Sequence, residues 1–345
     1  SKSINTQNKY NGDWLKFIDY CKYKHNCSPT DVDGLESAYN LVAEYLDWLD
    51  DDPEAKMYKG TSSIKGRENI NNNPYSISSS KSFVSKSYKA STIKRILASI
   101  TYKYRMNGFQ FDRKHPDISE TIASIQINQK NIRSGEAKEL LKDDIIKIID
   151  SIPEDENDFR AIRDKALILL GFYSFCRRSE ILGMKFNHLE FLDEGIQILI
   201  PFSKTDQIGE GRYIFIAKKN DKYCAVNSLK KWLEIIRIEN EDPLFYSINK
   251  SNKFNKYMLN KKNQKISLSD SSFVKILKNR AQLAGLNEIE KISGHSLRRG
   301  AISEARRNDL SINDIKAQSG HKSSQMIDLY SKVSDIKKTS VTKKI

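Results

Sequence analysis

Apolar residues recur at helical spacing through most of this sequence and alternate as in a β-strand at one place only. The stretch "LESAYNLVAEYLDWL" shows the helical pattern, because its apolar residues fall on one stripe of a helix. The exception is a pair of apolar runs, "GIQILIPF" and "RYIFIA", which are separated by the polar turn "SKTDQIGEG". The pattern therefore predicts a mainly α protein with one small antiparallel β-sheet.

Two polar breaks divide the helical pattern. Residues 50–87 are rich in Ser, Asn and Gly, which favours a flexible loop; a basic arm that contacts nucleic acid is the alternative. The second break, "RSGEAKE", follows the last helical stripe of the first part. A chain of 345 residues is long enough for two domains with separate cores. We therefore predict a helical domain over residues 1–133, a linker over 134–141 and a second domain that begins at 142.

The chain carries a formal net charge of +14 and has a pI of about 9.3. Such an excess of positive charge favours a polyanionic partner, and nucleic acid first, although the bias towards Lys, Asn and Ile is also typical of AT-rich genomes. An anionic membrane surface is the rival partner. We find no basic amphipathic helix with a bulky apolar face and no apolar run long enough to cross a bilayer. The sequence therefore favours nucleic acid over a membrane.

Cysteine usage and the first residues predict a cytoplasmic protein. The four cysteines show no CxxC spacing, so we expect reduced thiols that fill small apolar spaces. The stretch "SKSINTQNKY" lacks the apolar centre of a signal peptide. Both features are typical of a protein that stays inside the cell.

Six polar side chains stand at the ends of the predicted elements of the second domain. They supply two guanidiniums, one amine, two imidazoles and one phenol, and no carboxylates cluster with them to hold a hard metal ion. Two histidines without Cys or acidic partners would also make a poor zinc site, so we predict neither a metal nor another cofactor. The six residues are Arg177, Lys204, His295, Arg298, His321 and Tyr330.

This set of side chains suits an attack on a phosphodiester. The pentacoordinate phosphorus centre gains negative charge, which two arginines can neutralise with paired N–H donors. Histidine and lysine can transfer protons to and from the attacking and leaving oxygens, and a tyrosine phenol can act as the nucleophile. A phosphotyrosine linkage keeps the bond energy available for rejoining, which indicates that a strand is broken and resealed and not simply digested.

From about Lys142 onward, the sequence resembles the tyrosine recombinases of the phage-integrase group. "FCRRSEILGM" resembles their first catalytic-arginine motif, "SKTDQIGEGR" their β-hairpin lysine motif, and "HSLRRG" their His-x-x-Arg box. "GHKSSQMIDLY" resembles their last box, in which a histidine precedes the nucleophilic tyrosine by nine residues. The motifs stand in the family's order. The preceding helices are similar to the family's core-binding domain, so the resemblance covers most of the chain.

The resemblance implies a fold and the boundaries of its parts. It implies a helical, SAM-like core-binding domain for DNA over residues 1–133. A tyrosine recombinase catalytic domain follows over 142–330, mostly α with a small antiparallel β-sheet, which is the DNA breaking-rejoining enzyme fold. The tail, residues 331–345, is expected to contact neighbouring protomers.

The resemblance also implies a reaction and its partners. Proteins of this kind are site-specific recombinases or integrases of mobile elements, which cut and rejoin double-stranded DNA without metal. They work as a homotetramer on two recombination sites in the bacterial cytoplasm, and accessory DNA-bending proteins are compatible with that reaction. No motif marks the residues that contact bases, so the target sequence is left open.

Each of the six residues receives a role from the resemblance. Tyr330 attacks a DNA phosphate and forms a 3′-phosphotyrosyl bond, which a free 5′-hydroxyl of a partner duplex then attacks. The phosphoryl oxygens are held by Arg177 and Arg298. Lys204 protonates the leaving oxygen. The histidines are an acid or base, His295, and a hydrogen-bonding support for the phosphate, His321.

Other functions with the same fold or chemistry stay open. A type IB topoisomerase or a telomere resolvase shares the chemistry, and a DNA-binding regulator could keep the fold without cleaving strands.

Three further residues of these motifs are charged. Arg178 and Arg299 are assigned neither to phosphate nor to solvent, and Glu180 is predicted to orient a neighbour or cap its helix. Nine residues of ideal helix would place His321 and Tyr330 about 13.5 Å apart on opposite faces, so we expect the chain to bend between them.

Overall fold

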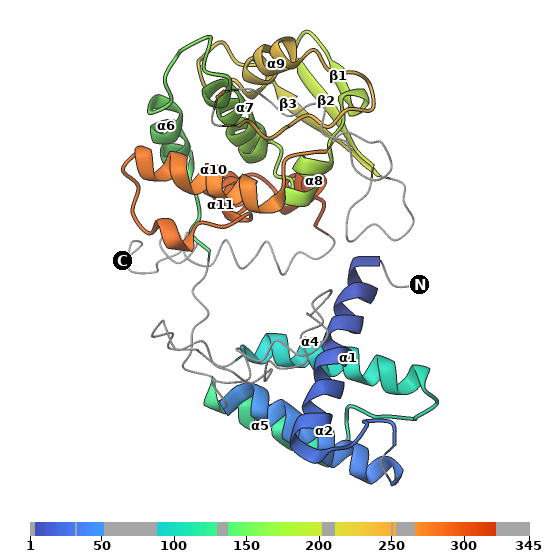
Figure 1. Ribbon diagram of the computed structural model, residues 1–345. Helices are drawn as coiled ribbons and strands as arrows, with labels where there is room; N and C mark the ends of the chain where they lie inside the picture. The colour runs from blue at the N-terminus through green and yellow to red at the C-terminus, as the bar shows by residue number, and fades with distance from the viewer. Residues whose placement is uncertain are drawn as a thin grey trace, which may run out of the picture. The chain divides into compact units, whose positions relative to one another are not determined.

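The computed structural model describes residues 4–31, 33–51, 88–129, 137–201, 211–249, 251–252 and 266–321. The chain divides into two compact units, Ser1–Ser134 (unit 1) and Gly135–Ile345 (unit 2). Helices dominate both units, and unit 2 also holds a three-stranded antiparallel sheet (Figure 1). The predicted fold class, mainly α with a small antiparallel sheet, is therefore confirmed. None of the described helices is long and apolar enough to span a membrane.

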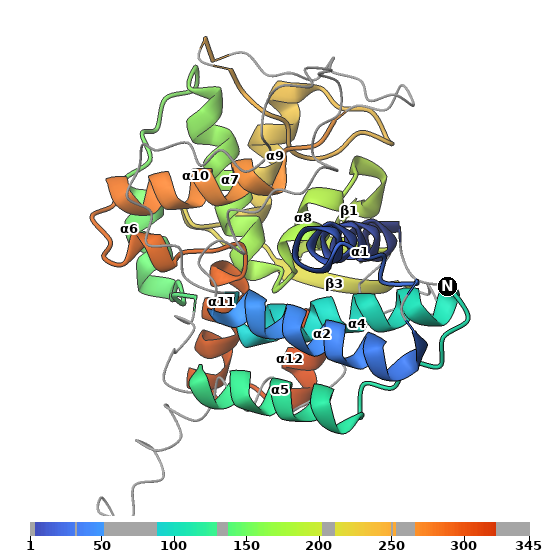
Figure 2. The same cartoon turned by 60° about the horizontal axis from the view of Figure 1, so that its bottom comes forward.

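The described part of unit 1 consists of α1 (Ile4–His25), α2 (Gly34–Asp51), α4 (Ala90–Met106) and α5 (Pro116–Asn128). Helix α1 packs on α4, and α2 packs on α5; Figure 2 looks almost along α1, with the other three helices running across the view. Phe17, Tyr45, Tyr104 and Phe111 are at most 1% exposed, and the rings of Tyr104 and Phe111 stack with their centroids 4.9 Å apart. These aromatic residues of unit 1 therefore form its core.

The helices of unit 2 are α6 (Lys142–Asp150), α7 (Phe159–Tyr173), α8 (Arg178–Gly183), α9 (Ala225–Ile236), α10 (Asp270–Leu283), α11 (Ser296–Arg307) and α12 (Ile312–Ser319). Helix α7 is central: every residue from Ala161 to Phe172 except Lys165 is buried, and α9 and α11 pack against it. The charged Asp164 is tolerated inside because Arg163 and Arg280 bind its two carboxylate oxygens at 2.6 and 2.8 Å. This buried helix is the support on which the ends of α8 and α11 are placed.

The sheet has the strand order β1 (Leu189–Phe191), β2 (Gly195–Ile200) and β3 (Arg212–Ala217), all antiparallel. The predicted strand pair is confirmed as β2 and β3, with Ile198 opposite Ile214 and Ile200 opposite Arg212. The isoleucines that alternate along both strands are buried, and Tyr213 and Phe215 lie on the exposed outer face. Residues 202–210, which connect β2 to β3, lie outside the described residues.

The last residues of the predicted linker, 134–141, are a packed part of unit 2. Leu140 is fully buried in the core of unit 2, and its amide donates to the carbonyl of Ser296 at 3.2 Å. Its backbone lies against Gly300 of α11 so closely that a Cβ at position 300 would overlap the Leu140 carbonyl oxygen. Leu140, which lies within the predicted linker, is therefore buried against a helix far along the chain.

This close approach generates a stability prediction. Gly300→Ala should destabilise unit 2 by about 2 kcal/mol or more, because the new methyl group meets backbone atoms that cannot move aside. Gly183→Ala is the matched control: Gly183 also lies in a short helix, is exposed, and has no atom within 4 Å of its missing Cβ. The control should be neutral or stabilising by about 0.5 kcal/mol. Equal thermal unfolding of the two variants by calorimetry would refute the packing argument.

Candidate active site

Arg177 stands at the turn between α7 and α8. Phe175 in this turn has a left-handed backbone (φ 56°), which is strained for a phenylalanine and reverses the chain after α7. Arg177 is the N-cap residue of α8, and its amide donates to Glu180 Oε2 at 2.8 Å. Its guanidinium Nη1 donates to the other oxygen, Oε1, at 2.7 Å. Glu180 therefore caps its helix and orients a neighbour, as predicted.

Arg298 is buried in the first turns of α11, with 5% of its surface exposed. Its Nη1 donates to the carbonyl oxygens of Phe175 at 2.7 Å and Ser319 at 2.8 Å. Its Nη2 lies 2.9 Å from Nε2 and 3.1 Å from Nδ1 of His321. Burial is the main reason why the pKa of Arg298 falls to about 10, so the side chain still carries its charge at neutral pH. The turn after α7 and the end of α12 thus hold the guanidinium of Arg298 in place.

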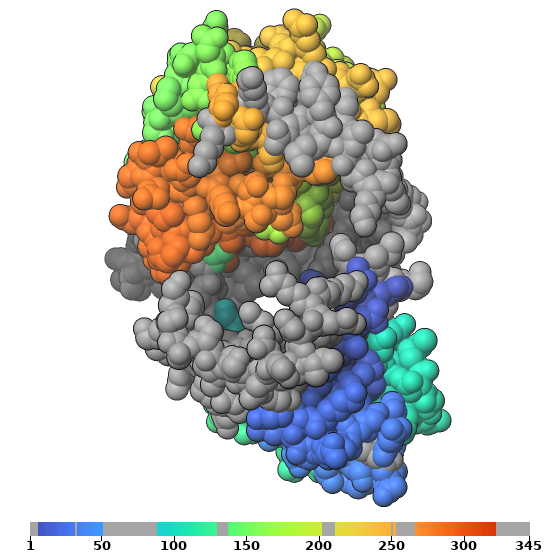
Figure 3. Space-filling view, viewed as in Figure 1, coloured from blue at the N-terminus to red at the C-terminus, as the bar shows by residue number. Residues whose placement is uncertain are grey.

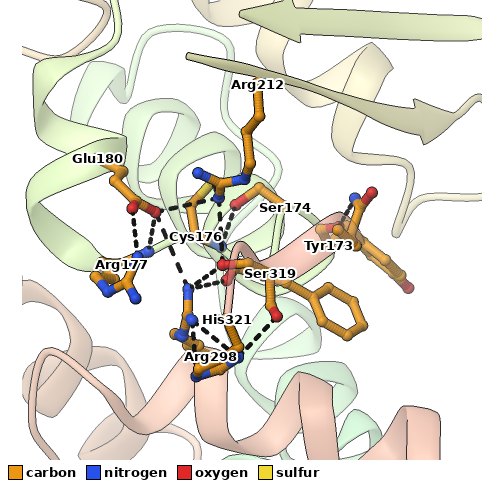
Figure 4. A network of polar contacts seen from close by, with 11 residues as sticks. Tyr173, Ser174, Cys176, Arg177, Glu180, Arg212, Arg298, Ser319 and His321 are labelled. Carbon is orange, nitrogen blue, oxygen red and sulfur yellow. Dashed lines mark hydrogen bonds and ion pairs between the residues drawn. The ribbon is translucent and has the colours of Figure 1, made fainter. Parts of the chain in front are cut away.

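The carboxylate of Glu180 lies between three guanidiniums (Figure 4). Its oxygens are 2.7 Å from Arg177 Nη1, 3.3 Å from Arg212 Nη2 and 4.0 Å from Arg298 Nη1. Burial by itself would raise the pKa of Glu180, but the Arg177 amide and the guanidiniums of Arg212 and Arg177 outweigh burial, and the pKa is lowered. The acid is therefore ionised, and the cluster keeps a surplus of positive charge.

His321 follows the left-handed Gly320 (φ 68°) that ends α12. Its Nδ1 lies 2.7 Å from Ser319 Oγ. Burial, followed by the charges of Arg298 and Arg177, lowers the pKa of His321 to about 4. The imidazole is therefore neutral at pH 7, which matches its position beside a guanidinium that can only donate.

His295 precedes α11 as its N-cap residue and is more exposed than His321. Its amide donates to Ser293 Oγ at 3.2 Å. Burial of part of the ring, then the charges of Arg178 and Arg298, lower the pKa of His295. Within the described residues, the His295 ring shares no hydrogen bond with the Glu180 cluster.

The structure thus brings together Arg177, Arg298 and His321 among the six predicted site residues. Lys204 and Tyr330 lie outside the described residues, as does the predicted bend before Tyr330. Sequence patterns do not indicate Arg212, whose Nη2 also donates to the carbonyl of Ser319 at 3.4 Å. Arg212 is the last residue of the quoted stretch "SKTDQIGEGR", in which only Lys204 is predicted to be a site residue.

Comparison with known proteins defines the class. The model of the phage integrase family matches residues 138–336, so the chain belongs to that family. An integrase/recombinase XerD homolog of Selenomonas ruminantium is 29% identical over 335 residues, which cover 96% of this chain and 82% of that protein.

Two solved structures show the shared fold. A lambda integrase tetramer bound to a Holliday junction has a TM-score of 0.51 at 15% identity, over 96% of this chain and 72% of that chain. The Tn1549 transposon integrase (residues 82–397) in complex with circular intermediate DNA has a TM-score of 0.50 at 11% identity, over 96% of this chain and 90% of that chain. At these identities the likeness concerns the fold.

The position of Glu180 predicts a pH-dependent loss of stability. Glu180→Gln should destabilise unit 2 at pH 7 by about 3 kcal/mol, because it leaves three guanidiniums without their counter-charge. Since folding lowers the pKa of Glu180, its ionised form stabilises the protein above its usual pKa range, and this contribution is lost as the pH falls through the lowered value. The gap between wild type and variant in urea unfolding should therefore shrink towards acid pH. Glu190→Gln, at the exposed residue of strand β1, is the control, and a gap that is constant with pH would contradict the assignment.

Proposed function

We propose that the protein is a site-specific DNA recombinase that cuts and rejoins duplex DNA through a 3′-phosphotyrosyl intermediate. One observation carries the proposal: two arginines and a neutral histidine from separate segments converge, in a chain of the phage integrase family, around a surplus of positive charge. A phosphodiester in its reacting state needs such donors.

The geometry suggests how each side chain would act. Arg298 is held by the carbonyls of Phe175 and Ser319, so its remaining N–H donors are oriented before a phosphate arrives. Arg177 would bind a second oxygen, and neutral His321 would add a hydrogen bond. His295, the exposed N-cap residue of α11, would act as an acid or base towards the reacting oxygens.

Two further residues would complete the reaction. Tyr330 would attack phosphorus and displace the 5′-hydroxyl, and Lys204 would protonate that leaving oxygen. A 5′-hydroxyl from the partner duplex would then attack the phosphotyrosine and release Tyr330. The bond count is the same before and after exchange, so no external energy source is required.

The partners belong to the same proposal. The +14 charge supports binding to DNA, and unit 1 would be the core-binding domain. One solved relative is a tetramer on a Holliday junction, which supports a homotetramer on two sites. Another is a transposon integrase with circular intermediate DNA, which supports a mobile-element role. Such an enzyme would act where the chromosome lies, in the cytoplasm.

The nucleophile can be tested directly. Tyr330→Phe removes one oxygen, so DNA binding should change little while the covalent protein–DNA adduct disappears. The substrate is a pool of nicked duplexes of randomised sequence, which lose the leaving strand after cleavage and trap the adduct on a denaturing gel. Sequencing the trapped DNA would identify the target. Tyr213→Phe is the matched control, because Tyr213 is 64% exposed on the outer face of the sheet.

The outcomes separate the alternatives for this chemistry. An adduct in Tyr330→Phe would overturn the nucleophile, and its absence from wild type would favour the non-cleaving regulator. The wild-type adduct should also form in excess EDTA, because Glu180, the acid of the described cluster, is already bound by arginines. Transfer of the trapped strand to a second duplex would distinguish a recombinase from a topoisomerase.

The tail gives a separate prediction about assembly. Residues 333–345 contain Ile336 and Val341 in a stretch too short for a core of its own, and we propose that they pack on a neighbouring protomer. Replacing both with Ser should leave binding to one DNA site intact but weaken pairing of two sites in light scattering. Replacing Lys337 and Lys338 with Ser is the matched control. Unchanged tetramers in the apolar variant would contradict this role.

A further inference from the structure

Each of the two site histidines follows a glycine, and an arginine occupies the space where that glycine's Cβ would be. A Cβ at Gly294 would lie 2.6 Å from Arg178 Nη1 and 2.7 Å from Arg178 Cδ. A Cβ at Gly320 would lie 2.8 Å from Arg212 Cζ and 2.9 Å from Arg212 Nε. Real Cβ contacts do not come this close, so a side chain at either position would make the arginine move from the place it has here.

Backbone conformation does not explain both glycines. Gly320 has a positive φ of 68°, which also favours glycine, whereas Gly294 is not among the positive-φ residues of the described chain. At Gly294 the packed Arg178 is therefore the reason that the structure offers for the missing side chain.

Both arginines are held at their far ends by acids on other elements. Arg178 Nη2 donates to Asp270 Oδ2 of α10 at 2.8 Å, and Arg212 Nη2 reaches Glu180 Oε2 of α8 at 3.3 Å. Residues of α10 and of the segment after it form part of the surface drawn in orange in Figure 3. Each arginine thus joins a glycine–histidine segment to a second helix.

In the packed position, each of the two arginine side chains has one buried N–H donor, its Nε, that makes no hydrogen bond in the described structure. An arginine extended into water would keep this N–H solvated, and a buried unpaired donor costs free energy. Two features that both arginines share favour the packed position: the acid at the far end and the contact with the glycine.

We propose that Arg178 and Arg212 are positioning residues, which seat the two glycine–histidine segments and thereby fix His295 and His321 against the catalytic arginines. This inference rests on the proposed function. It assigns a role to two arginines that are not among the six predicted site residues.

The charges of the two arginines also affect a measurable quantity, the pKa values of His295 and His321. Four arginines face His295, namely Arg178, Arg298, Arg177 and Arg299, and Arg178 is the largest charge contribution after burial to its lowered pKa. Around His321 the charges are Arg298, Arg177 and Arg212, with Glu180 acting in the opposite direction. Loss of the Arg178 charge should therefore raise the pKa of His295 towards its ordinary value.

The first experiment is an NMR titration of the free, full-length protein. With five histidines in the chain, each imidazole can be assigned. Arg178→Met keeps most of the side chain and removes the charge, so the pKa of His295 should rise while His25 of unit 1, the internal reference, is unchanged. Arg178→Lys should restore the low value, and Arg212→Met should raise the pKa of His321. Unchanged His295 and His321 titrations in the Met variants would overturn the proposal, whether or not the protein cleaves DNA.

The second experiment measures the rate of adduct formation on the pool of nicked duplexes. Gly294→Ala should slow the adduct by about 10-fold to 100-fold, because it displaces His295 by a fraction of an ångström to an ångström. In an Arg178→Ala background the same change should have little further effect, since the clash is gone. Gly183→Ala, with open space at its Cβ, should cleave as the wild type does.

The two experiments separate the failure of this inference from that of the proposed function. If wild-type protein forms no adduct, the proposed function fails, and the titrations still decide the positioning role. If wild type forms the adduct and Gly294→Ala forms it equally fast, the positioning role of Arg178 is refuted while the recombinase stands. In Arg178→Met, the acid limb of the pH–rate profile should move upward with the pKa of His295, which a purely structural role would not produce.

Discussion

The buried carboxylate of Glu180 is the interaction on which the rest of the site depends. Arg177, Arg212 and Arg298 each bring a guanidinium nitrogen within 4.0 Å of its oxygens. Two positive charges about 5 Å apart repel each other by about 3 kcal/mol at the effective dielectric constant of a partly buried site, so three bare cations would not gather there. One carboxylate offsets part of this charge and leaves a surplus. A phosphate group is the partner that the surplus favours, because its oxygens accept from the same N–H donors.

Backbone carbonyls complete the arrangement that the carboxylate begins. Arg298 donates to the carbonyls of Phe175 and Ser319, and both carbonyls are aimed by left-handed residues, Phe175 itself and Gly320. This conformation costs a non-glycine residue about 1–2 kcal/mol, so the strain at Phe175 is part of how the site is made. A guanidinium oriented in advance needs little reorganisation when charge develops on a bound phosphate.

Sequence patterns predict the features of this protein that depend on local spacing. The helical stripes and the β2–β3 hairpin are predicted, whereas β1 is not, because three residues are too few to show an alternation. Motif order likewise points to the two clustered arginines and the second histidine. It cannot point to Arg212, whose contact with Glu180 depends on how β3 packs beside α8. The packing of Leu140 could not be predicted from the sequence for the same reason, since Leu140 lies against Gly300, far along the chain.

Two of the four family motifs, "FCRRSEILGM" and "HSLRRG", carry two adjacent arginines, and in the structure the two members of each pair bind different partners. Neighbours on a helix point about 100° apart, so only one of each pair can face the cluster. In "CRRSE", Arg177 binds Glu180 and Arg178 binds Asp270 of α10; in "SLRRG", Arg298 faces the cluster and Arg299 binds Glu139, just before α6. The outer arginines are thus partly neutralised by acids on other segments. The surplus charge that a phosphate would meet therefore comes from the inner arginines, while the outer ones hold the site's helix ends to the segments around them.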